Sequence, residues 1–226
     1  REMELYYEEY AGHDIDAVIT TRELVRMIRS AHISPDTLED IASDRPMQEG
    51  SGAGVIFGAT GGVMEAALRS AYYLLKNENP EADAFKVVRS QGFQENDGVV
   101  EADFAIDDIT VKTAVVSGLA NTRALLEKIE RGDVHYDFVE VMACPGGCVG
   151  GGGQPIHEGK EMAEIRSKNL YFLDSQNERR FSHENPEVLK TYEEYLEKPL
   201  SRMSHKLLHT DHHGWDMPLA PKLKKR

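Results

Sequence analysis

The sequence is poor in cysteine and in basic residues. Two cysteines among 226 residues are too few for the disulfide framework of a small secreted protein, and a chain of this length buries a core without disulfides. With 26 Lys and Arg against 39 Asp and Glu, the net charge of −13 opposes binding to nucleic acid and to anionic membranes. Small molecules or other proteins are therefore the expected partners.

Long apolar runs are also missing. No segment reaches the roughly 18 apolar residues that a membrane-spanning helix needs, and no apolar signal segment follows the start of the sequence. We therefore expect no membrane span and a cytoplasmic location. The sequence starts with Arg1 instead of Met, and no helix cap precedes its first residues, so we expect the start to be a cut in a longer chain.

Both cysteines stand in one uncharged stretch, residues 141–154. Cys144 and Cys148 are four residues apart, and the stretch holds six of the 19 glycines. Thiolates are preferred ligands of iron–sulfur clusters and zinc, and glycine lets backbone N–H groups approach a sulfide or another anion closely. The stretch therefore predicts a cradle for a cluster, with a disulfide or half of a zinc site as the alternatives.

The apolar pattern predicts an α/β fold with a small, mainly parallel sheet flanked by helices. The predicted strands cover residues 16–21, 85–89, 98–104, 110–116 and 136–142. A helix near Asn121, with Leu125 and Leu126 facing inward, joins the last two strands into a βαβ unit. The cysteine stretch follows the second strand of this unit directly, and sites in such sheets gather where strands end. Its position thus supports a site.

Further helices are expected near both ends of the chain. One begins after a cap at Thr20 or Thr21, with Leu24, Met27 and Ile28 facing a core, and a second begins near Pro35 with Leu38 and Ile41 inside. Residues 42–54 are predicted to be a loop. After Gln154 the expected helices cover residues 161–168, 185–196 and 201–209. We predict three parts: a lobe at residues 1–158, a helical segment at 159–210 and a tail at 211–226.

Three other patterns have plainer interpretations. The Gly-Ala-Thr-Gly-Gly turn at residues 58–62 could present a helix N-terminus to a phosphate, but it lacks the residues of a phosphate loop or a dinucleotide fingerprint. Glu65 and Arg69 form an i, i+4 pair that is expected to be structural. The spacing of His205, His209 and His213 would suit a metal, but a polar surface role or a role in packing between lobes is favoured.

Several motifs resemble those of the iron-only, or FeFe, hydrogenases. Met-Ala-Cys-Pro-Gly-Gly-Cys-x-x-Gly-Gly-Gly-Gln at residues 142–154 is similar to the third cysteine motif of that family, and Phe-Gly-Ala-Thr-Gly-Gly-Val-Met-Glu-Ala-Ala-Leu-Arg at 57–69 is similar to the motif before it. Asn185-Pro-Glu-Val, Lys198-Pro-Leu-Ser and the run at 204–210 resemble the family's C-terminal helical segment, which some members carry as a small subunit. The resemblance spans nearly the whole chain.

This resemblance implies the reaction 2H⁺ + 2e⁻ ⇌ H₂ at an H-cluster. The H-cluster joins a 4Fe-4S cubane to a two-iron unit that carries CO, CN⁻ and a dithiolate bridge. By position in the motif, Cys144 would ligate the cubane, while Cys148 would ligate it and also bridge to the two-iron unit, as the catalytic residue of this chain. Phe57, Gly58 and Met142 would surround the two-iron unit. The implied partners are an electron-transfer iron–sulfur or flavin subunit or a ferredoxin, together with H₂ and protons.

The sequence also departs from the family. The two earlier cysteine motifs, which supply the other two cluster ligands, the proton-delivering cysteine and a lysine near the cyanide, do not occur in it. We therefore expect this chain to work only with an N-terminal half that carries them. The alternative is a hydrogenase-like iron–sulfur protein with a sensing or cluster-assembly role and no hydrogen turnover.

Overall fold

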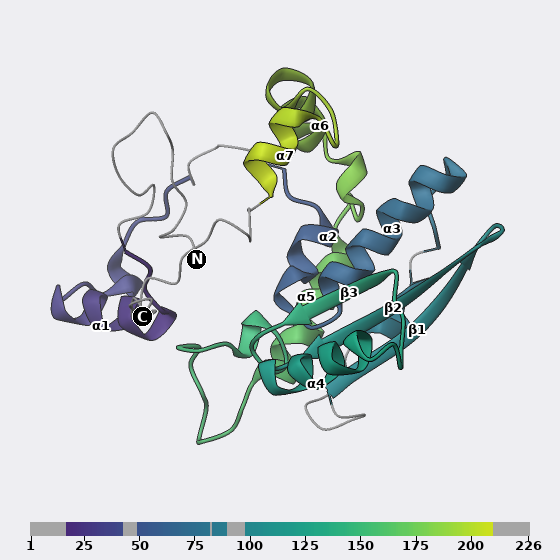
Figure 1. Cartoon of the computed structure of the whole chain (residues 1–226). Helices are drawn as coiled ribbons and strands as arrows, with labels where there is room; N and C mark the ends of the chain where they lie inside the picture. The colour runs from purple at the N-terminus through teal and green to yellow at the C-terminus, as the bar shows by residue number, and fades with distance from the viewer. Residues whose placement is uncertain (1–16, 43–48, 82, 90–97, 210–226) are drawn as a thin grey trace, which may run out of the picture.

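The computed structural model describes residues 17–42, 49–81, 83–89 and 98–209. These residues form an α/β structure in which helices flank a small sheet, as predicted, with α4 on one face and α3 on the other (Figure 1). The strands are β1 (Val99–Ile106), β2 (Ile109–Ser117) and β3 (Phe138–Met142). The α-helices are α1 (Thr21–Ser30), α2 (Gly52–Val55), α3 (Gly62–Lys76), α4 (Leu119–Glu130), α5 (Ala163–Gln176), α6 (Pro186–Thr191) and α7 (Arg202–Leu208).

The sheet is mixed, so the prediction of a mainly parallel sheet is wrong. Its strand order is β1-β2-β3, with β1 antiparallel to β2 and β2 parallel to β3. A tight turn at Asp107 and Asp108 joins β1 to β2, and a connection this short permits only an antiparallel pair. The predicted βαβ unit is confirmed as β2-α4-β3. Ser117 and Met142 pair at the carboxyl ends of its two strands.

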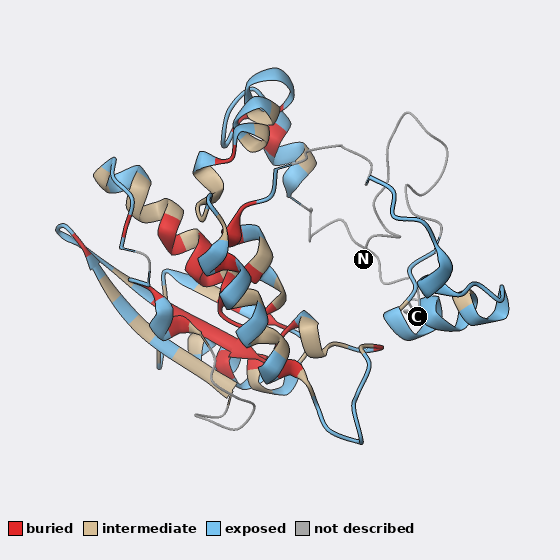
Figure 2. Ribbon diagram, turned by 180° about the vertical axis from the view of Figure 1, so that it is seen from behind, coloured by how far each residue is buried: buried red, intermediate tan, exposed pale blue. Residues whose placement is uncertain are grey.

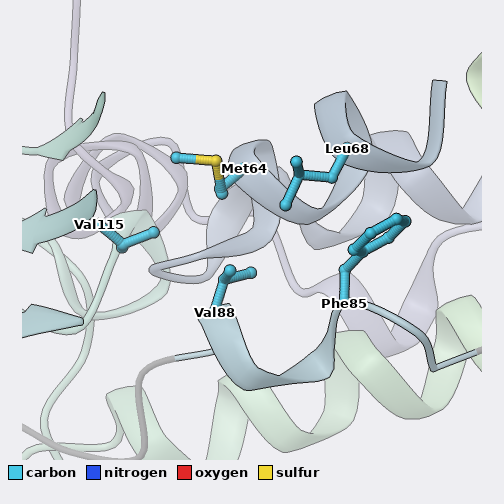
Figure 3. Close-up of a cluster of buried hydrophobic side chains, with 5 residues drawn as sticks. All are labelled: Met64, Leu68, Phe85, Val88 and Val115. Carbon is cyan, nitrogen blue, oxygen red and sulfur yellow. The ribbon is translucent and has the colours of Figure 1, made fainter. Parts of the chain in front are cut away.

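The second half of strand β2, from Thr113 to Ser117, is buried on both faces. Ala114 and Val116 pack with Leu125 of α4, whereas Val115 lies in a cluster with Met64 and residues from α3 and the following turn. The members of this second cluster are Met64, Leu68, Phe85, Val88 and Val115 (Figure 3). Because neighbouring strand residues point to opposite faces, β2 lies between α4 on one side and α3 on the other. Figure 2 shows the buried residues concentrated along the sheet and α3.

The N-terminal predictions are partly wrong. Residues 17–20 form no strand; the first helix starts directly at Thr21. Thr20 is its N-cap, as predicted, and forms a capping box with Glu23. Helix α1 has no buried residue, and Leu24 and Met27 are exposed instead of facing a core. Helix α1 is therefore amphipathic, but its apolar stripe is not buried against any of the described residues.

Two short segments also differ from the prediction. The predicted strand at residues 85–89 is a single 3₁₀ turn (Lys86–Val88), because Phe85 and Val88, three residues apart, both enter the same cluster. The helix expected near Pro35 is only a 3₁₀ turn (Pro35–Thr37), and Leu38 and Ile41 after it are exposed. Within the predicted loop at 42–54, residues 43–48 lie outside the described residues and Gly52–Val55 is helical.

The C-terminal part is helical, as predicted. Helix α5 extends eight residues beyond the predicted end at Lys168, to Gln176. Asn185 caps α6, a π-helical turn (Tyr192–Leu196) follows it, and Ser201 caps α7. Three further 3₁₀ turns are Ile56–Gly58, Cys148–Gly150 and Ser182–Glu184. The predicted tail lies outside the described residues. In the described part of the chain, every helix is too short or too polar to cross a membrane.

Candidate metal centre

The cysteine loop, defined as residues 143–154, leaves the sheet where its two parallel strands end together. The Gly118 N–H donates to the carbonyl of Met142 at 2.8 Å, and the Gly146 N–H donates to Ser117 Oγ at 3.0 Å. Successive 3.0 Å hydrogen bonds then fold the loop, from Gly147 N–H to the Cys144 carbonyl and from Gly151 N–H to the Cys148 carbonyl. The loop is thus fixed to the sheet at its start and closed by its own backbone.

Both cysteines are free thiols, which contradicts the disulfide alternative. Cys144 is half-buried and Cys148 is exposed, so at least one thiol remains open to a ligand. The structure brings Met142 next to Cys148, with 3.9 Å between Met142 Sδ and Cys148 Sγ. Met142 itself is buried. The predicted neighbours Met142 and Cys148 therefore lie together at the end of β3.

Glycine at position 147 lets the cysteine loop touch the turn that contains Phe57 and Gly58. Gly147 has φ +99°, and a Cβ added there would lie 2.5 Å from the Gly58 carbonyl oxygen. Phe57 belongs to the same turn and is 47% exposed, so its ring is not part of the core. The two sequence motifs, about 85 residues apart, therefore meet backbone to backbone.

The loop also leaves room beside the cysteine sulfur. A Cβ at Gly151 would stand 3.2 Å from Cys144 Sγ, so glycine at this position keeps that side of the thiol clear. Two thiols on a glycine-rich loop suit an iron–sulfur cluster in donor chemistry, but a cubane takes four cysteine ligands. The described residues contain no cluster of three or more His, Cys, Asp or Glu side chains that could hold a metal. The loop therefore fits as half of a cluster site.

The N-terminus of α3 already holds an anion, the carboxylate of Glu140. Gly61 N–H donates to Oε1 at 2.7 Å and Met64 N–H donates to Oε2 at 2.6 Å. Burial raises the pKa of Glu140, and the backbone N–H donors partly oppose that rise. Because this carboxylate occupies the helix N-terminus, the turn is not free for a phosphate. Glu140 instead ties β3 to the Gly-Ala-Thr-Gly-Gly turn, a contact that the sequence did not reveal.

Helix α5 contacts both loops of the site. A Cβ at Gly58 would meet Leu170 Cδ1 at 2.9 Å, and a Cβ at Gly150 would meet the Cβ of Ala163 at 2.6 Å. Arg166, between them on the helix, donates from Nη1 to the carbonyl of Val149 at 2.8 Å. These residues were not predicted as site residues, because only the tertiary fold places α5 over the cysteine loop.

A buried charged cluster lies near the C-terminal end of α5. The pair between Glu65 and Arg69 is confirmed as structural, and Arg69 also donates to both carboxylate oxygens of Asp174, at 2.9 and 2.8 Å. Burial would lower the pKa of Arg69, but the bonds and charges of Asp174 and Glu65 outweigh it and raise that pKa. For Asp174, burial would raise the pKa, yet Arg69 and Arg180 lower it. Glu65, Arg69 and Asp174 are each at most 2% exposed.

The predicted histidine stripe is only partly described. The rings of His205 and His209 lie 4.7 Å apart, while His213 lies outside the described residues. Neither ring belongs to a group of three or more potential metal ligands among the described residues. A packing role for this pair stays a prediction.

Comparison with known proteins relates both parts of the chain to one group of enzymes. Residues 1–152 match the family described as iron only hydrogenase large subunit, C-terminal domain, and residues 160–215 match iron hydrogenase small subunit. The chain is 45% identical over 198 residues to the NADP-reducing hydrogenase subunit HndD of Solidesulfovibrio fructosivorans, covering 87% of this chain and 33% of that protein.

A solved structure and a second kind of relative extend this comparison. A variant of apo FeFe-hydrogenase HydA1 from Chlamydomonas reinhardtii superposes with a TM-score of 0.66 at 39% identity, over 88% of this chain and 55% of that one. The cytosolic Fe-S cluster assembly factor narfl of Xenopus tropicalis is 31% identical over 218 residues, covering 93% of this chain and 44% of that protein. The chain thus spans a third to about half of these relatives.

Proposed function

Because this chain belongs to the family formed by the C-terminal domains of iron-only hydrogenase large subunits, we propose that it forms part of a hydrogenase that catalyses 2H⁺ + 2e⁻ ⇌ H₂. The observation that carries the proposal is the free Cys144 and Cys148 pair on a loop at the end of β3, with the buried Met142 sulfur 3.9 Å from Cys148 Sγ. This chain would supply two of the four cluster cysteines.

Each site residue has a proposed role. Cys144 would hold the 4Fe-4S cubane, and Cys148 would hold it and bridge to the two-iron unit with its CO, CN⁻ and dithiolate ligands. When bound, this H-cluster would supply the redox chemistry and the site at which hydrogen reacts. Met142 would exclude water beside Cys148, since it is buried and apolar. Phe57 and Gly58 would line the same space, because their turn touches the cysteine loop.

The remaining parts of the enzyme are proposed to lie outside this chain. An N-terminal half would carry the other two cysteines and the proton-delivering cysteine, and an iron–sulfur or flavin subunit or a ferredoxin would exchange electrons. The described residues contain no third cysteine, in keeping with an incomplete site. We place the assembly in the cytoplasm, a prediction that cell fractionation with an antibody to this chain tests.

A second candidate is cluster sensing or assembly without hydrogen turnover. The 31% identity to narfl, over nearly the whole chain, favours it. The higher identity to HndD and the presence of both Phe57 and Met142 favour the hydrogenase, because a protein without the two-iron unit has less need of an apolar wall there. The two candidates differ in whether the two-iron unit binds.

Anaerobic isolation of the chain with its co-purifying partners, followed by infrared spectroscopy, separates the two. Bands from iron-bound CO and CN⁻ are expected for the hydrogenase. A preparation with a full cubane and no such bands would favour cluster assembly. The Cys148→Ser variant of the same assembly should lose the bands and the hydrogen turnover, because a hydroxyl bridges soft irons poorly. If Cys148→Ser retained hydrogen uptake, the bridging role of Cys148 would be wrong.

A further inference from the structure

A single side chain of α5 spans the part of the cysteine loop that follows Cys148. Arg166 donates from Nη1 to the carbonyl of Val149 at 2.8 Å and from Nη2 to the carbonyl of Pro155. The glycine run, residues 150–153, lies between these two carbonyls in the chain. We infer that Arg166 is a positioning residue for Cys148, which closes the glycine run and holds a positive charge beside it. This inference rests on the proposed role of Cys148 as a cluster ligand.

The glycine run has few bonds of its own. Gly151 N–H donates to the Cys148 carbonyl and Gln154 N–H donates to the Gly151 carbonyl, each at 3.0 Å, and each bond closes a single turn. Glycine loses more conformational freedom on folding than any other residue, so four glycines in a row are hard to fix in one conformation. Contacts from outside the run are therefore needed if Cys148 is to keep one orientation.

Two neighbouring helices touch the ends of the run. A Cβ at Gly150 would stand 2.6 Å from the Cβ of Ala163 on α5, and a Cβ at Gly153 would stand 2.2 Å from the Cβ of the residue that caps α1. Among the described residues, nothing lies within 4 Å of a Cβ added at Gly152. Because α5 approaches so closely at Gly150, the side chain of Arg166, one turn after Ala163, reaches both ends of the run.

A guanidinium suits this bridge because its N–H groups form a planar fork. Charged donors bind carbonyl oxygens more strongly than neutral donors do, and Arg166 is half-buried, which limits competition from water. A lysine at this position would present one compact ammonium group and could not span the two carbonyls in the same way. The bridge therefore depends on the shape of arginine as well as on its charge.

The charge of Arg166 has a second effect. Among the described residues, Arg166 binds carbonyl oxygens and forms no ion pair with a carboxylate, so its charge is not neutralised. The Val149 carbonyl that it binds belongs to the residue directly after Cys148. A fixed cation this near to a ligand favours the more negative, reduced form of a bound cluster and so raises its reduction potential.

Hydrogen exchange in the metal-free full-length chain tests the positioning role. In Arg166→Met, the amides of Gly151 and Gln154 should exchange at least about tenfold faster than in the parent, because the charged bonds that hold the run are lost. Amides of β2 should keep their rates. Unchanged rates at Gly151 and Gln154, or an equal acceleration along α5, would overturn the inference, because Arg166 would then stabilise only its own helix.

The matched control is Lys168→Met on the same helix, which removes an exposed cation paired with Glu164 and should change the loop rates by less than about twofold. Gly152→Ala, where the added Cβ has open space, should also stay within about twofold. Arg166→Lys should exchange at rates between those of the parent and Arg166→Met. If circular dichroism shows that Arg166→Met is not folded, Arg166→Lys against the parent decides, and equal rates in these two would refute the bridge.

The reduction potential of the bound cluster tests the charge. In the anaerobically isolated assembly, a redox titration followed by electron paramagnetic resonance should give a lower cubane potential for Arg166→Met, while Arg166→Lys and Lys168→Met stay close to the parent. The parent potential in Arg166→Met would refute the role of the charge. If no cubane binds at all, the proposed function fails, and hydrogen exchange in the metal-free chain still decides whether Arg166 positions the loop.

Discussion

The cysteine loop contacts the N-terminal half of α5 and the buried charged cluster lies near its C-terminal end, and the two regions differ in whether their reactive groups have partners. In the cluster, the charges of Glu65, Arg69 and Asp174 are balanced by neighbours within the chain. In the loop, Cys148 is exposed and its thiol lies 3.9 Å from the sulfur of Met142, which is a weak acceptor. One region is complete, and the other presents groups to a ligand.

In this chain, a side chain's partners distinguish a structural role from a functional one better than its residue type does. Charged residues are the usual candidates for catalysis, yet here the buried ones satisfy each other and hold helices together. The groups suited to bind a cofactor are the two thiols, and their loop is held by backbone hydrogen bonds and by the side chains of Ser117 and Arg166. Variants that remove a buried charge should therefore cost more stability than variants in the loop.

The largest expected effect is in the charged cluster of the intact chain. Asp174→Asn should lower the free energy of unfolding by about 3–5 kcal/mol, because Arg69 and Arg180 lose a buried counter-charge. Urea denaturation followed by circular dichroism measures this change. Glu164→Gln, on the exposed face of α5, is the control and should stay within about 1 kcal/mol. Equal effects of the two variants would mean that burial does not increase the contribution of the Arg69–Asp174 ion pair to stability.

A smaller loss is expected when the cysteine loop is forced away from the Gly58 turn. Gly147→Ala should destabilise the chain by about 3 kcal/mol, because φ +99° strains an L-residue and the new Cβ meets the Gly58 carbonyl oxygen at 2.5 Å. Gly132→Ala has φ +75° but open space around the Cβ, and it should lose only about 1 kcal/mol. Thermal unfolding distinguishes them, and similar losses would show that the loop yields without strain.

Replacing the carboxylate that joins the two site motifs should cost less. Glu140→Gln keeps the volume but leaves one of the two N–H donors, on Gly61 or Met64, facing an amide NH₂ group. We expect a loss of about 2 kcal/mol in unfolding free energy. Glu127→Gln, which is exposed on α4, should change it by less than about 0.5 kcal/mol. A neutral Glu140→Gln would indicate that the protonated form of Glu140 already serves this position.

The smallest expected effect is a pH dependence at His183, whose ring nitrogens contact Ser70 and Asn79. Burial lowers the pKa of His183, whose ring stacks on Tyr73 at 4.1 Å. The unfolded chain therefore takes up a proton near the ordinary value of 6.5 while the folded chain does so only at lower pH, so the contribution of His183 to stability is lost as the pH falls below 6.5. Denaturation between pH 7.5 and about 5 should show a shallower decline for His183→Gln; an unchanged slope would exclude His183 as its source.

The sequence predicted the local features best. Thr20 and Asn185 act as helix caps, because a cap depends on side chains only a few residues apart. The β2-α4-β3 unit forms as predicted, since consecutive strand, helix and strand patterns favour a right-handed crossover, and the cysteine loop follows β3. The predicted strand at residues 85–89 failed because two valines in a row suit a strand in isolation, whereas packing against Met64 and Leu68 selects a 3₁₀ turn.

Contacts between distant residues were not predictable from the pattern. Glu140 looks like one more acid in an acidic chain, and nothing in its neighbourhood marks it as the partner of an N–H group 76 residues earlier. The same holds for Asp174, which lies 105 residues from Arg69, and for Arg166 on the Val149 carbonyl. The apolar stripe of α1 shows the reverse, since its pattern predicted burial that the described residues do not provide.

The alternation along β3 has a consequence for electron exchange. Glu140 and Met142 are buried on the same face of the strand while Val141 between them is exposed, so the residue fixed to α3 and the residue beside Cys148 form one rigid piece. Because both side chains are buried, we expect this wall to move little when a neighbouring group gains or loses charge. If a redox group binds at Cys148, the protein on this side should therefore contribute little to the reorganisation energy of electron transfer.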